Sequence, residues 1–108
     1  MPKRDKSFHD YVLYDLFGGL DGVTSKPMFS GWGIYKNGRI FAVINESELF
    51  AKGSEETGKI YESRGGERFT YAVKNRREPV KLPYWSVPED VLENREALME
   101  WIRLATKN

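Results

Sequence analysis

The sequence predicts one α+β domain, with helices packed on an antiparallel β-sheet. Three observations support this class. The dipeptide Asn37-Gly38 supplies the positive φ angles that a two-residue type I′ turn requires, and the apolar strand-like runs around it are typical of a β-hairpin. Apolar residues recur at helical spacing from Leu98 to Ala105. The length of 108 residues suits a single hydrophobic core, so we expect no domain boundary within 1–108.

The N-terminal segment is expected to form a helix followed by an edge strand. Ser7, with an acidic residue three positions later, has the form of a helix N-terminus, and apolar residues then repeat at helical spacing. We therefore expect a helix over Phe8–Phe17, which Gly18-Gly19 would end. The segment Val23–Phe29 can enter the sheet, and Pro27 places it at an edge or a bulge because proline has no N–H to donate.

The stretch from Met28 to Lys52 is expected to form an antiparallel meander. A regular type I′ turn would pair Ile34 with Phe41 and Trp32 with Val43. Alternation would then sort the side chains onto two faces, with Trp32, Ile34, Phe41 and Val43 on one and Tyr35, Ile40, Ala42 and Ile44 on the other. Because both faces are apolar, we expect this part of the sheet to be covered on both sides.

A turn and a short helix are expected after the first hairpin. The turn around Glu46-Ser47 lacks the residues that tight turns prefer. Ser54, followed by two acidic residues, predicts the cap of a helix that ends near Ser63. Gly58 lies inside this helix, where glycine costs about 1 kcal/mol relative to alanine.

The C-terminal part is expected to form a second hairpin and a final helix. Alternation over Phe69–Val73 predicts a strand, and a polar turn leads to a partner strand at Pro79–Leu82. Pro79 places this second hairpin at a sheet edge. We interpret Pro83–Pro88 as a stiff aromatic connector. The final helix has one apolar stripe that should lie on the sheet: Leu98, Trp101, Ile102 and Ala105.

Composition excludes several classes of function. The chain has no cysteine, so disulfides, thiol catalysis and cysteine-bound metals are excluded. A formal net charge of +1 is too small to imply nucleic acid or a membrane surface through bulk electrostatics. Apolar runs stay far below the roughly 18 residues of a membrane span, and the basic start lacks an apolar signal core. We therefore expect a cytoplasmic protein without a membrane partner.

We predict no catalytic, cofactor-binding or metal-ligating residues, and a protein that is not an enzyme. His9 is the only histidine, and we expect a solvated surface residue rather than a general base. Ser30 lacks the Gly-x-Ser-x-Gly context of a nucleophile, so we interpret it as a bulge or turn residue. Gly31-Trp32-Gly33 precedes a strand rather than a phosphate-binding helix. The carboxylates are scattered without the spacing of metal ligands.

Three stretches resemble one known family: Met28–Tyr35, Phe69–Tyr71 and Tyr84–Leu92. In this order they look like the N-terminal domain of the TfoX/Sxy proteins, which are bacterial regulators of natural competence. The resemblance covers roughly Tyr11 to Ala105. The family usually has Met-Phe-Gly-Gly where this chain has Met28-Phe29-Ser30-Gly31.

The resemblance implies a fold similar to that of type III secretion chaperones, often completed by a homodimer. Full-length family members carry a second, C-terminal helical domain, and this chain resembles a stand-alone N-terminal domain. Full-length members act with the cyclic AMP receptor protein as transcriptional co-regulators without a known catalytic activity. The resemblance therefore implies a regulatory or protein-interaction domain, and the role of stand-alone domains of this kind is mostly unassigned.

Two surfaces are candidates for binding. Basic residues of the second hairpin are candidates for nucleic-acid contact: Lys74, Arg76, Arg77 and Lys81. Charged residues there would also protect a sheet edge from aggregation, which needs no ligand. Aromatic residues are candidates for a protein partner or, less favoured, for a small-ligand cleft: Tyr84, Trp85, Trp32 and Tyr35. The alternative is that Tyr84 and Trp85 pack into the core and hold the last helix.

Overall fold

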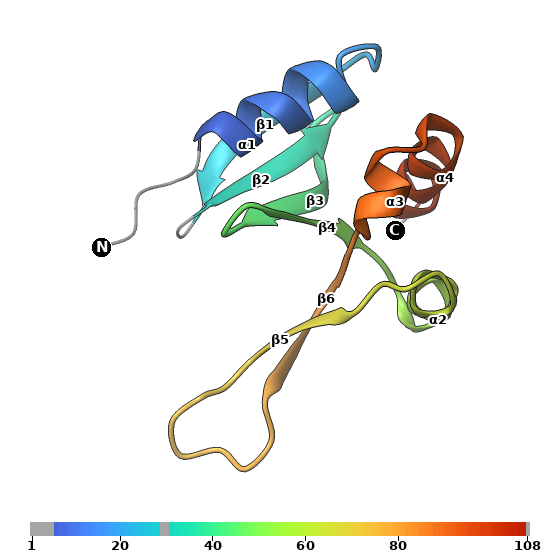
Figure 1. The fold of residues 1–108 in the computed structure, drawn as a ribbon. Coiled ribbons are helices and arrows are strands. Elements are labelled where there is room, and N and C mark those ends of the chain that lie inside the picture. The colour runs from blue at the N-terminus through green and yellow to red at the C-terminus, as the bar shows by residue number, and fades with distance from the viewer. Residues whose placement is uncertain (1–5, 29–30, 108) are drawn as a thin grey trace.

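The computed structural model describes residues 6–28 and 31–107 and contains a six-stranded sheet with helices packed on one face (Figure 1). The strands are β1 (Val23–Met28), β2 (Gly31–Lys36), β3 (Arg39–Asn45), β4 (Glu48–Lys52), β5 (Arg68–Tyr71) and β6 (Val80–Ser86). Their order in the sheet is β1-β2-β3-β4-β6-β5, and neighbouring strands are antiparallel. The predicted α+β class is confirmed, and Pro27 lies on an edge strand as expected.

The helices are α1 (Lys6–Asp10), the π-helix η1 (Tyr11–Leu16), α2 (Glu55–Ser63), α3 (Glu89–Leu92) and α4 (Arg95–Thr106). The Ser54 side chain caps α2 by accepting from the N–H of Thr57, as predicted. Asn94 caps α4 in the same way. The predicted first helix is present but changes its winding. The N–H of Phe17 donates to the carbonyl of Val12, five residues back, which is the π-helical pattern.

The hydrophobic core lies between the helices and one face of the sheet. The predicted stripe of α4 is buried there. Tyr61 of α2 stacks on Trp101 of α4 with ring centroids 4.4 Å apart. Val12 and Leu16 of η1 join the same cluster. In Figure 1, α1 and η1 cover the strands at one end of the sheet, and α3 and α4 lie beside them.

A β-bulge makes the predicted register wrong beyond the first two pairs of the hairpin. The register shifts between Ile34 and Tyr35, and the following pairs are Ile34 with Ala42, Gly33 with Val43 and Trp32 with Ile44. Ala42 and Ile44 therefore lie on the helix side, and Val43 lies on the opposite face. Because the extra residue is on β3, Phe41 also stays in the helix-side core, where its ring is 5.6 Å from that of Phe17.

The predicted connector is also wrong in part, since residues 83–86 continue strand β6. This half of β6 pairs with β4 through Phe50 with Ser86, Ala51 with Trp85 and Lys52 with Tyr84. Its first half pairs with β5 alone, so the β5–β6 hairpin extends beyond the rest of the sheet (Figure 1). A proline inside a strand favours the connector interpretation, but Pro83 keeps a useful acceptor. Its carbonyl accepts from the N–H of Gly53.

Both turns of the meander have left-handed backbone. Asn37 and Gly38 have φ angles of 52° and 84°, which confirms the predicted type I′ turn. Glu46 and Ser47 have φ angles of 49° and 62°, although neither is glycine or asparagine. Left-handed residues with a side chain cost roughly 1–2 kcal/mol each. The second turn is therefore strained.

Candidate functional site

His9 is buried, with 8% of its surface exposed, so the prediction of a solvated histidine is wrong. Its Nδ1 lies 2.8 Å from Oδ1 of Asp10, and its Nε2 lies 2.8 Å from Oγ of Ser25 on β1. The ring also packs against Trp32, with centroids 4.5 Å apart. The three polar groups have the hydrogen-bond order of a serine hydrolase. Ser25, however, lies within an edge strand rather than on the sharp strand-to-helix turn that exposes a nucleophile. We interpret this series of hydrogen bonds, here called the polar tie, as a structural link between α1 and β1.

The two candidate tryptophans lie on the helix side of the sheet. Trp85 is 2% exposed, and its Nε1 donates to Oε2 of Glu62 at 2.8 Å. Its indole ring packs directly on Gly58 of α2, and the guanidinium of Arg68 lies 4.8 Å from the ring centroid. Trp32 is buried against His9. Both indoles therefore belong to the core. For Trp85 this favours the alternative of packing into the core over that of contacting a partner.

The two candidate tyrosines lie on the opposite face. Tyr84 pairs with Lys52 next to the buried Trp85, so alternation turns it away from the helices. Burial raises the pKa of the Tyr84 hydroxyl, and the nearby Tyr35 raises it further. The ammonium of Lys26 lies 5.4 Å from the centroid of the Tyr35 ring. The structure therefore separates the four aromatic candidates into two core residues and two residues of the other face.

The sheet face opposite the helices, here called the outer face, is apolar. Val43 and Phe50 pair there and are each only 8% exposed, and Phe50 packs on Phe69 with the ring centroids 4.6 Å apart and the rings tilted by 38°. Met28 of one edge strand and Phe69 of the other line the same groove of about 200 Å³, so the sheet curls around this face. Among the described residues no helix covers it. The outer face consists of Met28, Tyr35, Ile40, Val43, Phe50, Phe69, Leu82 and Tyr84.

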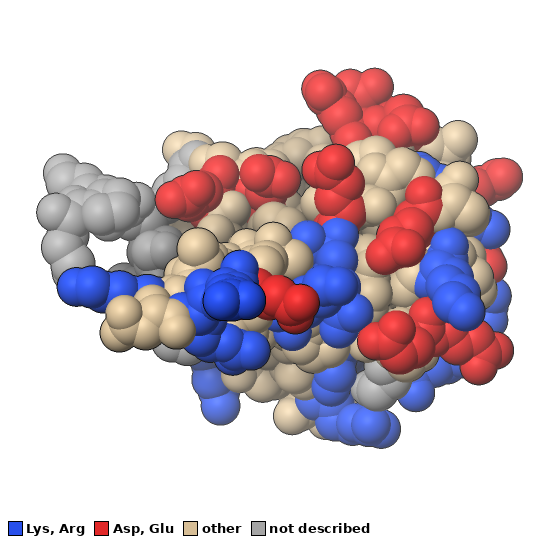
Figure 2. Space-filling model, turned by 90° about the horizontal axis from the view of Figure 1, so that it is seen from below, with Lys and Arg blue, Asp and Glu red and all other residues tan. Residues whose placement is uncertain are grey.

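The basic candidates lie together on the β5–β6 hairpin and are exposed: Lys74, Arg76, Arg77 and Lys81. In the described part of the chain, no carboxylate lies within ion-pair distance of any of them. Arg68, at the base of the hairpin, is instead paired with Glu55 at 3.2 Å. Figure 2 views the molecule from the side toward which the hairpin extends. Lys and Arg gather in the middle and lower part of that view, and Asp and Glu gather along its upper and right margins.

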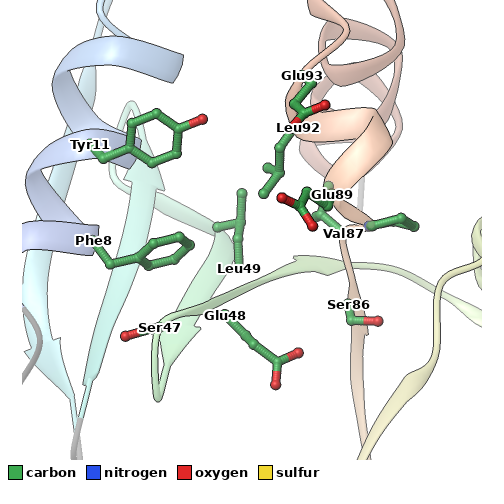
Figure 3. Close-up of a pocket in the computed structure, with 11 residues that line it drawn as sticks. Phe8, Tyr11, Ser47, Glu48, Leu49, Ser86, Val87, Glu89, Leu92 and Glu93 are labelled. Carbon is green, nitrogen blue, oxygen red and sulfur yellow. The ribbon is translucent and has the colours of Figure 1, made fainter.

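A groove of about 460 Å³, here called the α1–α3 groove, lies between the N-terminal helices and α3 (Figure 3). Its lining comes from three segments that are far apart in the sequence: Phe8, Tyr11, Ser47, Glu48, Leu49, Ser86, Val87, Pro88, Glu89, Leu92 and Glu93. Sequence reasoning missed this groove because no local motif joins these segments. The one available signal is Tyr11, an aromatic residue beside the buried residues of the first helix.

Within residues 6–28 and 31–107, no three Asp, Glu or His side chains are placed so that they could hold a metal ion. No helix in these ranges is long and apolar enough to cross a membrane. Ser30, interpreted above as a bulge or turn residue, lies outside the described residues.

Comparison with known proteins gives one match. A family model described as the TfoX N-terminal domain matches residues 15–108. A comparison with curated proteins finds no match. The matched range contains every strand of the sheet and α2 to α4, so the outer face and the basic hairpin lie inside it. The resemblance seen in the three stretches is thereby confirmed.

Proposed function

We propose that this chain, which belongs to the TfoX N-terminal domain family, is a non-enzymatic regulatory domain that acts in the cytoplasm by binding other protein chains. We further propose that it forms a homodimer through the outer face. The observation that carries both proposals is the apolar outer face, which no helix covers among the described residues. Around the buried Val43 and Phe50, the other members of this face are partly exposed, and contiguous exposed apolar patches mark sites of protein association.

The chemistry of the outer face supports a protein partner. An antiparallel sheet with one face in water normally alternates apolar and polar residues. Here Val43 and Phe50 are buried on the face that should be polar. Tyr35 and Tyr84 lie at the same face, and tyrosines are enriched in interfaces because they bury a large ring while keeping a hydroxyl for hydrogen bonding. A patch that a second copy also presents can close a two-fold dimer, because such an interface is self-complementary.

Light scattering of the full chain at micromolar concentration tests the homodimer. We expect a mass twice that of the 12.5 kDa monomer. Tyr35→Lys places a charge on the outer face and should shift the protein toward the monomer. Tyr14→Lys is the matched control, since Tyr14 is 70% exposed on η1, on the helix side of the molecule. A wild-type monomer over the whole concentration range, or equal dissociation of both variants, would contradict a dimer through this face.

Nucleic-acid binding is a second candidate function, and one observation favours it. Lys74, Arg76 and Arg77 are exposed on a hairpin that extends from the sheet, and no described carboxylate pairs with them. Free cations of this kind are suited to phosphate contacts, which weaken as salt displaces them.

An amide NMR titration with a mixed-sequence DNA duplex, at low and at physiological salt, tests this candidate. Binding through the hairpin should shift the amides of residues 74–81 and persist at physiological salt. Arg76→Glu/Arg77→Glu should abolish the shifts, whereas Lys59→Glu/Lys107→Glu, with the same change of charge elsewhere, should leave them unchanged. Shifts that disappear with modest salt, or that survive the Arg76 and Arg77 reversal, would remove the nucleic-acid function.

A further inference from the structure

We propose that the α1–α3 groove binds a basic amphipathic helix of a partner protein. This inference rests on the proposed protein-binding function and assigns it a second surface, separate from the outer face. The groove combines an apolar interior with a rim on which every charged side chain is acidic. Its occupant is therefore a segment with apolar residues on one side and Lys or Arg residues beside them.

The walls of the groove present apolar side chains to its interior. Phe8 of α1 and Tyr11 of η1 lie on one side, and Leu92 of α3 lies on the other, with Leu49 between them (Figure 3). Tyr11 is a large aromatic residue, yet 37% of its surface is exposed instead of being buried in the core beneath α1 and η1. Two helical walls over an apolar floor form the arrangement in which an amphipathic helix docks with residues at i, i+3, i+4 and i+7.

The charges at the rim determine the sign of the partner. Glu89 and Glu93 lie on the α3 side of the groove, and both are exposed, whereas the Glu48 side chain points away from Tyr11 and Leu92 (Figure 3). The groove has no Lys, Arg or His in its lining, so a basic segment would meet no like charge there. Complementary charges around an apolar contact guide the encounter and discriminate between partners. An acidic or neutral helix would leave the carboxylates of Glu89 and Glu93 without partners.

Two unusual backbone features lie at the same groove. Tyr11 is the first residue of the π-helix. This conformation is rare in proteins, and where it occurs it is often at a functional site. Ser47, at the other end of the groove, belongs to the strained turn with φ of 62°. Strained or rare backbone conformations cluster at binding sites. Both features lie where they shape the groove.

Selection from a displayed library of helix-forming peptides, with the full wild-type chain as the target, tests the proposal. We expect the enriched peptides to carry Lys or Arg beside apolar residues spaced by three and four positions. A synthetic peptide with the enriched sequence should shift the amides of residues 8–11, 47–49 and 87–93. Its affinity, measured by fluorescence anisotropy, should fall as salt is raised.

Charge reversal at the rim provides the decisive comparison. Glu89→Lys/Glu93→Lys should weaken the peptide at least tenfold, while Glu56→Lys/Glu78→Lys, an equal change of charge away from the groove, should leave the affinity unchanged. Tyr11→Ser should weaken the peptide without changing its salt dependence. Circular dichroism of each variant confirms that the fold is kept.

Several results would overturn the groove proposal, and they separate it from the proposed function. Peptides without basic residues, or peptides that bind the reversed variant equally well, remove the assigned partner chemistry. Peptides that map to the outer face leave protein binding in place and overturn only the groove. Self-association that is lost both in Glu89→Lys/Glu93→Lys and in Arg76→Glu/Arg77→Glu means that the hairpin of a second copy occupies the groove. A monomeric chain for which no peptide is enriched contradicts the proposed function as well.

Discussion

Replacement of Gly58 by alanine should destabilise this protein, although alanine is the better helix former. Gly58 lies inside α2 and faces the indole of Trp85. A Cβ atom at Gly58 would lie 2.7 Å from both Cε2 and Cη2 of that ring, and closer still to Cζ2. The ring has little room to move away, because its Nε1 donates a hydrogen bond to Glu62 and Tyr61 packs beside it.

The expected size of the effect follows from two opposing terms. Alanine gains about 1 kcal/mol over glycine through helix propensity. Overpacking of a close-packed core typically costs about 1–3 kcal/mol, and this overlap involves several ring atoms of a buried side chain. We therefore expect Gly58→Ala to lower the free energy of unfolding by up to about 2 kcal/mol. The melting temperature should fall by roughly 4–8 °C for each kcal/mol lost.

Urea unfolding followed by far-UV circular dichroism measures this change. The double mutant with Trp85→Phe tests the cause, since the smaller ring leaves space for the added methyl group. In that background Gly58→Ala should be neutral or stabilising by up to about 1 kcal/mol. Lys59→Gly on the exposed side of α2 calibrates the propensity of this helix. Stabilisation by Gly58→Ala in the wild-type background would refute the packing of Trp85 against α2.

Three further predictions concern the core, the second turn and the polar tie. Burial raises the pKa of Tyr61 above its ordinary value of 10.0, so the unfolded chain loses this proton at a lower pH than the folded protein does. The free energy of unfolding should therefore fall above pH 10 by about 1.4 kcal/mol per pH unit, and by less in Tyr61→Phe, as measured by urea unfolding between pH 8 and 11. Glu46→Asn/Ser47→Gly should relieve the left-handed strain and raise stability by about 1–2 kcal/mol in a thermal melt; an unchanged or lower melting temperature would show that the turn is not strained. Ser25→Ala leaves Nε2 of His9 without its hydrogen-bond partner and should lower the free energy of unfolding by about 1–3 kcal/mol, as measured with urea. A fluorophosphonate probe should not label the wild type, and labelling of Ser25 would contradict a non-enzymatic domain.

Features of the candidate binding surfaces were predictable from the sequence only where residues close together in the chain determine their exposure. The basic residues of the hairpin are exposed because they cluster in one turn, and the sequence predicts that turn directly. The burial of His9 was not predictable, because Ser25 and Trp32 reach it from other segments. The α1–α3 groove likewise forms only when residues 8–11 meet residues 87–93.

The register of the meander shows the same division within one element. Asn37-Gly38 determines the turn and the two pairs next to it. The bulge beyond them keeps Phe41 in contact with Phe17, a residue of the first helix. No local pattern around the turn reports a contact with so distant a segment, so the prediction omits the bulge and every pair beyond it is displaced by one residue on β3.

The sequence by itself determined the α+β class, the cap at Ser54 and the first turn, because these depend on residues that are close along the chain. Only the tertiary structure decided which face of the sheet the helices cover. Alternation along a strand separates two faces but does not say which one is inside, and here both are apolar. The packing of α2 on Trp85 and of α4 on β3 and β4 makes that choice, and it leaves Tyr84, the neighbour of Trp85 on β6, on the outer face.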